Sequence, residues 1–139
     1  MKQKLKINSA SIKVRPDGFN ETNDCSVRAT AIATNAPYEL VHSFFKKRGR
    51  QDKHGVYYMP FYRRHRLEFT KEFNCYFSEL PVTKRCSTYN RFITWYKQGT
   101  FIVTVDSHVA CIKDGIVLDG AVANMHIKNI IQVFKKPTA

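Results

Sequence analysis

The stretch from residue 100 to residue 119 constrains the fold more than any other part of the sequence. It holds three short apolar runs, "TFIVTV" (100–105), "HVACI" (108–112) and "IVLD" (116–119). Asp114 and Gly115 lie between the last two runs, and an Asp-Gly pair between apolar segments is one of the strongest hairpin signals in a sequence. We therefore expect three antiparallel strands here, and a fourth in "HIKNIIQVF" (126–134).

Helical patterns precede these strands. Residues 25–34 contain no Gly or Pro, and their apolar positions share one helix face. A second helix is expected after Pro37. A third is expected between a cap at Ser87 or Thr88 and a stop at Gly99, with a buried stripe of Phe92, Trp95 and Tyr96.

The remaining segments are harder to interpret. Residues 56–86 mix aromatic side chains with arginines, which predicts irregular structure with one strand around 67–73. A loose alternation over residues 4–14 predicts a short strand or an ordered arm. Helices followed by an antiparallel meander predict an α+β fold, organised as a single domain over residues 1–139.

Length and composition favour a globular protein outside the membrane. Of the 139 residues 43% are hydrophobic, yet no apolar run reaches the length of about 18 residues that a membrane span needs. The basic N-terminus lacks the apolar stretch of a signal peptide, so we expect a cytoplasmic protein with reduced cysteines. Lys and Arg number 23 against 11 acidic residues, and the resulting charge of +12 favours nucleic acid or another acidic partner.

Cys25, at the expected start of the first helix, is the candidate for chemistry. It follows Asn23 and Asp24, two residue types that commonly cap helices. At a helix N-terminus the macrodipole and the unpaired backbone N–H groups stabilise a thiolate. Cys25 is therefore a candidate nucleophile, whereas the other cysteines are expected to be structural (Cys75, Cys86 and Cys111).

The hairpin supplies a base and an acid for this thiolate. A two-residue turn pairs Lys113 with Ile116, and the same register sets residue 110 opposite Asp119. His108 then shares a face with residue 110, diagonal to Asp119 and within reach of its carboxylate. His108 is the candidate base and Asp119 the candidate orienting acid, with Asp106 as an alternative acid.

This arrangement resembles a known family. A Cys that opens an early helix, a His on a strand and an acid on the next strand follow the chain order of papain-like cysteine peptidases. Residues 22–50 and 99–120 are also similar to small bacteriophage proteins of papain-like fold. The resemblance implies a papain-like fold in which N-terminal helices pack on a C-terminal antiparallel sheet. It further implies Cys25 as nucleophile, His108 as base and Asp119 as the acid that orients the imidazole.

One position departs from the family pattern. Papain-like enzymes usually carry a Gln six residues before the Cys, where its amide donates a hydrogen bond to the oxyanion. This chain has Phe19 at that position, and the nearby amides Asn20 and Asn23 are the candidate donors. Loss of one oxyanion donor typically lowers the rate by about 10²–10³-fold.

A basic, aromatic segment favours binding. Between residues 46 and 71, cations interleave with aromatic rings, a composition that suits phosphate contacts and base stacking on single-stranded nucleic acid. The alternative is that the rings form the core and the cations point outward. The rings are Tyr57, Tyr58, Phe61 and Tyr62, and the cations are Lys46, Lys47, Arg48, Arg50, Lys53, Arg63, Arg64, Arg66 and Lys71.

Two functions fit these features. The first is a papain-like thiol hydrolase, encoded by a phage and acting in the host cytoplasm on a peptide, isopeptide or amide bond of a peptide or protein. The second is a catalytically dormant scaffold that binds a host protein or nucleic acid through its basic face. The Cys and His spacings give no zinc site and there is no phosphate-binding glycine loop, so neither function is expected to need a metal or cofactor. The sequence leaves the oligomeric state open.

Overall fold

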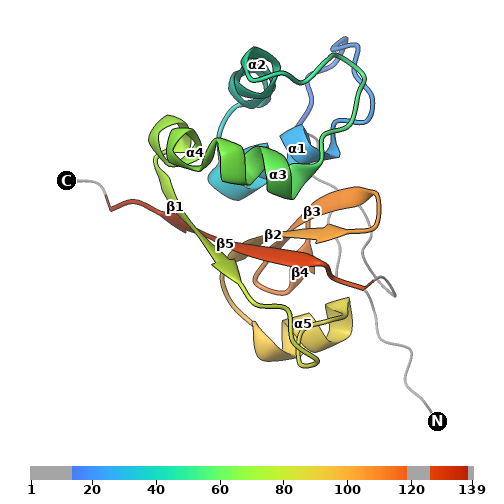
Figure 1. Cartoon of the computed structure of the whole chain (residues 1–139), viewed down its shortest axis with the longest axis vertical. Helices are drawn as coiled ribbons and strands as arrows, with labels where there is room; N and C mark the ends of the chain where they lie inside the picture. Colours follow the sequence, from blue (N-terminus) through green and yellow to red (C-terminus); the bar gives the residue numbers. More distant parts are fainter. Residues whose placement is uncertain (1–13, 119–125, 138–139) are drawn as a thin grey trace.

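The protein has an α+β fold, as the sequence predicts. The computed structural model describes residues 14–118 and 126–137, which form five helices and one five-stranded sheet. In Figure 1 the first four helices lie above the sheet and the fifth lies below it. The elements in chain order are α1 (Cys25–Thr34), α2 (Tyr38–Lys47), α3 (Tyr58–Arg64), α4 (Arg66–Phe73), β1 (Cys75–Leu80), α5 (Tyr89–Trp95), β2 (Thr100–Val105), β3 (His108–Lys113), β4 (Ile116–Val117) and β5 (Asn129–Lys135).

The order of strands in the sheet is β1-β5-β2-β3-β4, and every neighbouring pair is antiparallel. The run β2-β3-β4 is the predicted meander. The last strand differs from the prediction, because β5 lies between β1 and β2 and does not continue beside β4. Neighbouring residues Ile130 and Ile131 are both buried and point to opposite faces of β5, which suits an interior strand covered on both sides.

The predicted hairpin is confirmed. Lys113 pairs with Ile116, and Ile112 with Val117. Asp114 and Gly115 have φ values of 50° and 81°, the left-handed conformation that a type I′ turn requires at both central positions. This turn fixes which face each side chain of β3 occupies, since adjacent residues of a strand alternate between the two faces.

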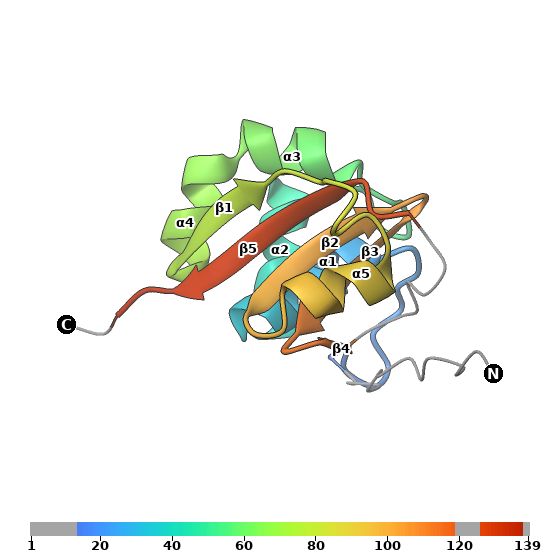
Figure 2. The same cartoon turned by 90° about the horizontal axis from the view of Figure 1, so that it is seen from below.

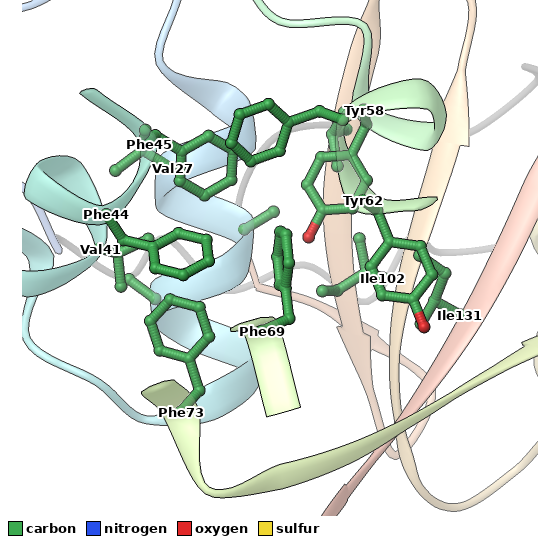
Figure 3. Packing of buried hydrophobic residues seen from close by; sticks show 14 of the residues in the cluster. Val27, Val41, Phe44, Phe45, Tyr58, Tyr62, Phe69, Phe73, Ile102 and Ile131 are labelled. Carbon is green, nitrogen blue, oxygen red and sulfur yellow. The ribbon is translucent and has the colours of Figure 1, made fainter. Parts of the chain in front are cut away.

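A hydrophobic cluster lies on each face of the sheet. The larger one, beneath α1–α4, gathers aromatic rings around Phe69, whose centroid is 5.0 Å from that of Phe44 and 5.3 Å from that of Tyr62 (Figure 3). The smaller cluster packs α5 on the other face, where Phe92 meets Phe101 edge to face at 5.0 Å. The first cluster therefore fixes α1, the helix that begins at Cys25, on the sheet.

Residues 56–86 differ from the prediction. The irregular chain with a strand at 67–73 is replaced by α3, α4 and β1. Tyr58, Phe61 and Tyr62 follow helical spacing and are buried, and Pro60 lies in the first turn of α3, where its missing N–H breaks no helical hydrogen bond. The high density of aromatic residues concealed this helical period.

One part of the prediction for α5 is confirmed, and another part is wrong. Thr88 is the N-cap, and its hydroxyl accepts a hydrogen bond from the Arg91 backbone N–H at 3.4 Å. Phe92 is fully buried, but Trp95 is 53% exposed and lies under the guanidinium of Arg85 at 4.6 Å. A seven-residue helix has a narrow buried face, here formed by Tyr89 and Phe92.

The Thr88 cap gives a first testable prediction. Thr88→Ala should lower the free energy of unfolding by about 1 kcal/mol, because the Arg91 N–H loses its acceptor. Urea unfolding followed by circular dichroism measures the change. Thr94→Ala makes the same chemical change later in α5, where the hydroxyl only bonds the Asn90 carbonyl within the helix, and should leave stability nearly unchanged. Equal losses in the two variants would contradict a capping role.

Candidate active site

Cys25 occupies the position that the sequence suggests. It is the first residue of α1, and α1 packs against β3 (Figure 1). Its side chain is partly exposed, whereas Cys75, Cys86 and Cys111 are buried, and none of the four forms a disulfide. The structure thus gives one of the four cysteines both solvent access and the electrostatic field of a helix N-terminus.

His108 and the Val109 backbone N–H both hydrogen-bond the sulfur of Cys25. Burial raises the pKa of the Cys25 thiol, but these two hydrogen bonds, together with the charges of His108 and Arg28, outweigh burial. The pKa of Cys25 therefore lies below the usual value for a thiol. A nucleophile hydrogen-bonded to a base is the basic unit of thiol catalysis.

His108 is positioned by the tight turn that joins β2 to β3. Ser107 has a φ of 59°, and His108 opens β3 directly opposite Val105. The Nε2 atom of His108 is buried and has no hydrogen-bond partner within the described residues. An acid that orients the imidazole would bond this nitrogen, since the ring also contacts Cys25. The predicted acid, Asp119, lies outside the described residues.

The register of the hairpin extends to the residue before Asp119. The Leu118 N–H donates to the Cys111 carbonyl at 2.9 Å, which continues the pairing of Ile112 with Val117. The alternative acid, Asp106, is exposed at the mouth of the site, with an oxygen 4.0 Å from the Lys128 amine. Among the described acids, none bonds His108 Nε2.

The residues before α1 do not cap the helix as predicted. Asp24 is the N-cap residue, but its side chain makes no capping hydrogen bond. Its buried carboxylate instead accepts hydrogen bonds from the Tyr38 hydroxyl at 2.7 Å, Arg28 Nε at 3.0 Å and Arg15 Nη1 at 3.2 Å. Burial raises the pKa of Asp24, but these partners outweigh it and hold that pKa below its usual range.

Glu21 is the centre of a buried ion pair that sequence reasoning missed. Arg50 donates to both of its oxygens, at 2.9 and 3.1 Å, and both side chains are almost completely buried. His42 Nε2 lies 2.7 Å from one oxygen, and the Lys53 backbone N–H donates to the other at 2.6 Å. The hydrogen bond from Arg50 contributes most to lowering the pKa of Glu21 well below its usual range. Glu21 thus joins the segment before Cys25 to the loop that follows α2.

Cys25 and His108 open into a cleft of about 660 Å³. One wall is the segment 55–60, where Tyr57 is 88% exposed. The other wall comes from the ends of β2, β3 and β5, and includes Lys128 and Asn129. The first wall is tied to the start of α1, because Asn23 donates to the Lys53 carbonyl at 3.1 Å. The cleft is large enough for a chain of a few residues.

The two candidate oxyanion donors have different environments. Asn20 is exposed and does not line the cleft, so the structure does not bring it to Cys25. Asn23 lines the cleft, and its amide is hydrogen-bonded to the Lys53 carbonyl. Asn129 also lines the cleft, with its Oδ1 accepting from the Thr104 hydroxyl at 2.8 Å. No sequence motif pointed to Asn129, because only the pairing of β5 with β2 brings it there.

Four of the nine cations of the basic segment form ion pairs with acids. Arg50 is buried against Glu21 and cannot contact a ligand, while Lys46 pairs with Asp52, Arg48 with Glu68 and Arg63 with Glu79. Lys47, Arg64 and Arg66 are exposed and form no ion pair with the described residues. The predicted stacking of bases on Tyr58, Phe61 and Tyr62 is wrong, since these rings belong to the core and only Tyr57 is exposed.

Glu21, His42 and Asp52 bring their ligand atoms within 4.8 Å of one another. This spacing resembles that of the ligands in a metal site, but basic side chains already lie where a metal ion would bind. Arg50 binds Glu21, and the Lys46 amine lies 3.2 Å from Asp52. The cluster therefore serves as an internal ion-pair network.

Removal of His108 tests the thiolate directly. In His108→Ala, burial still raises the Cys25 pKa while one hydrogen bond and one charge that lower it are lost, so the pKa should rise. The rate of alkylation by iodoacetamide at pH 7 should fall several-fold, because only the thiolate reacts. The midpoint of the plot of alkylation rate against pH should move to higher pH. His54→Ala, a change of an exposed histidine, is the control. An unchanged pH profile in His108→Ala would contradict this account.

Together, the fold and the site define an α+β protein with a Cys–His pair in an open cleft. Comparison with known proteins adds no relative: no protein-family model, curated protein or solved structure matches the chain. Within the described residues, no helix is long and apolar enough to cross a membrane.

Proposed function

We propose that the protein is a thiol hydrolase with a papain-like arrangement, which cleaves a peptide, isopeptide or amide bond. The observation that carries the proposal is the hydrogen bond between His108 and the thiol of Cys25, the first residue of α1. The low pKa of Cys25 and the cleft around it support the same chemistry. That a phage encodes the protein, and that it acts in a host cytoplasm, rests on the family resemblance alone.

The reaction follows from the two side chains. The Cys25 thiolate attacks the carbonyl carbon, and a C–S bond forms. The oxyanion that develops lies at the start of α1, where the first backbone N–H groups lack helical partners. Protonated His108 then gives its proton to the leaving amine as the C–N bond breaks. Water, deprotonated by His108, hydrolyses the thioester, which releases the acid and restores the thiolate.

The orienting acid belongs to the same proposal. His108 Nε2 needs an acceptor that holds the ring in the correct tautomer and stabilises the imidazolium. Asp119 is the proposed acceptor, because it is the next residue in the sequence after Leu118, whose N–H bonds the Cys111 carbonyl on the strand that begins with His108. Asp119→Ala should leave alkylation of Cys25 measurable while lowering turnover, since the imidazolium loses its hydrogen-bond acceptor.

A peptidyl acyloxymethyl ketone tests the function on the unmodified chain. This probe mimics an acyl substrate and alkylates a thiolate that has an adjacent proton donor. Mass spectrometry of the digested adduct should place the label on Cys25 and leave Cys75, Cys86 and Cys111 unlabelled, because those three are buried. Unfolding in urea before labelling is the control and should abolish the label on Cys25, because it separates the thiol from His108. Equal labelling of buried cysteines in the folded protein, or none at Cys25, would overturn the proposal.

A binding function is the second candidate. The charge of +12 favours an acidic partner, and Lys47, Arg64 and Arg66 remain exposed for contact. This function does not need Cys25. Binding that survives Cys25→Ala and weakens with salt would support it, whereas binding that is indifferent to salt would contradict it.

A further inference from the structure

The uncovered part of the sheet carries two exposed aromatic rings. Tyr76 on β1 pairs directly with Phe134 on β5, and their side chains are 53% and 45% exposed. Figure 2 views the sheet from the α5 side and shows β1 and β5 without a helix over them, whereas α5 lies in front of β2. Large aromatic rings are usually buried, so two neighbouring exposed rings indicate a surface that meets a ligand.

These rings lie on the face opposite to α1–α4. Their neighbours along the strands, Phe77 and Val133, pack into the cluster beneath those helices, and adjacent strand residues alternate between faces. The next pair on the aromatic face is Ser78 and Gln132, which is polar. The surface therefore combines two rings with hydrogen-bonding groups.

Cations lie at this end of the sheet on both of its faces. The Lys136 amine lies 5.2 Å from the centroid of the Tyr76 ring, on the aromatic face. Lys135 and Lys113 lie at the same end but belong to the face of α1–α4, because Lys135 pairs with Cys75, and Lys113 pairs with Thr100, which in turn pairs with Val133. The nearby acid is Asp114, whose carboxylate accepts the Gly99 N–H at 2.8 Å. With an overall charge of +12, the field here favours a polyanion.

We propose that the face formed by Tyr76, Phe134, Gln132 and Lys136 binds single-stranded nucleic acid. Directly paired side chains have Cβ atoms about 4.5–5.5 Å apart, a spacing that lets two rings stack on successive bases. Lys136 lies beside the Tyr76 ring, where a phosphate of the same strand can reach it. Unpaired bases are required, because the faces of bases in a duplex are already stacked on one another.

This surface is separate from the thiol cleft. Asn129, at the start of β5, lines the cleft, and Phe134 comes five residues later, about 17 Å away along the strand. The proposal therefore does not depend on Cys25, and it places nucleic-acid contact away from the segment 46–71.

Fluorescence anisotropy with a labelled oligothymidine of about 20 nucleotides at low salt tests the proposal. Tyr76→Ala and Phe134→Ala should each weaken binding by about 5- to 100-fold, the usual loss of one base–aromatic stack. Tyr76→Phe and Phe134→Tyr keep the rings and should retain the affinity. Leu67→Ala, which removes an 83% exposed apolar side chain from α4 on the other face, is the matched control and should bind as the unmodified protein does.

Binding to heparin separates the contribution of base stacking from that of charge, since heparin is a polyanion without bases. The alanine variants should bind heparin with unchanged affinity, and a duplex of the same length should bind more weakly than the single strand. The proposal is overturned if the protein does not bind oligothymidine at low salt. It is also overturned if Tyr76→Ala and Phe134→Ala bind oligothymidine unchanged, if they lose heparin binding to the same extent, or if Leu67→Ala weakens binding equally.

Discussion

Cys25→Ser should lower hydrolysis of a susceptible amide or ester substrate by more than about 10⁴-fold, the loss typical of removing a nucleophile that acts as a unit with its base. A serine hydroxyl has a much higher pKa than a thiol, so the hydrogen bonds from His108 and the Val109 N–H no longer yield an anion. A chromogenic thioester or p-nitrophenyl ester, with the product followed by absorbance, measures the rate. The fold should persist, because Cys25 is only partly buried.

Cys75→Ala is the matched control for this substitution. It removes a buried thiol on β1, away from the cleft, and should leave turnover unchanged even if it lowers stability somewhat. If Cys25→Ser hydrolyses the substrate at the rate of the unmodified protein, the thiol chemistry proposed for the cleft is excluded. The binding proposal for the sheet face would still stand, since it involves none of these residues.

Glu21→Gln should destabilise the protein by about 3–5 kcal/mol, the typical result of removing one partner of a buried ion pair. The substitution conserves shape but leaves the charge of Arg50, which is completely buried, without a counter-charge. It also weakens the contacts of Glu21 with His42 and the Lys53 N–H. Chemical denaturation followed by tryptophan fluorescence or circular dichroism measures the change.

A second variant separates lost charge from lost packing. Glu21→Gln combined with Arg50→Met removes both charges, and it should recover part of the stability that Glu21→Gln alone loses. Glu39→Gln changes an exposed glutamate on α2 and should have little effect. A double variant that is no more stable than Glu21→Gln would show that the buried charge of Arg50 is not the cause.

The pH dependence of stability follows from the same residues. The pKa values of Glu21 and Asp24 are lower in the folded protein than in the unfolded chain, where carboxyl groups titrate at about 4. Their contribution is therefore fully present above that pH and is lost as the pH falls toward the folded values. Between about pH 5 and pH 3, Glu21→Gln should lose less stability than the unmodified protein. A steeper loss in the variant would contradict the assignment of Glu21.

Local signals in the sequence predicted much of the fold. The helix at residues 25–34, the cap expected at Ser87 or Thr88 and the turn at Asp114-Gly115 all depend on residues that contact their near neighbours in the chain. Segment 56–86 was predicted wrongly because its aromatic residues occur so often that no single period stands out. The place of β5 in the sheet was also missed, since strand order depends on long-range pairing.

In the candidate site, too, local features were predicted from the sequence and long-range contacts were not. The sequence indicated Cys25 and His108 separately, one from its place at a helix start and the other from its place on a strand. It gave no sign of the Glu21–Arg50 pair, because an acid and an arginine in two loops carry no periodic pattern. It also suggested Asp24 as a cap, whereas the carboxylate bonds Tyr38, Arg28 and Arg15.

By itself, then, the sequence determined the helix at residues 25–34, the hairpin at Asp114-Gly115, and that a thiol begins the first helix, because these depend on short-range backbone geometry. Only the tertiary structure decided that His108 reaches Cys25, that Arg50 is buried, and that Tyr76 and Phe134 lie side by side in solvent. Such contacts form when packing of the two hydrophobic clusters fixes distant segments against each other, and no local pattern encodes the result.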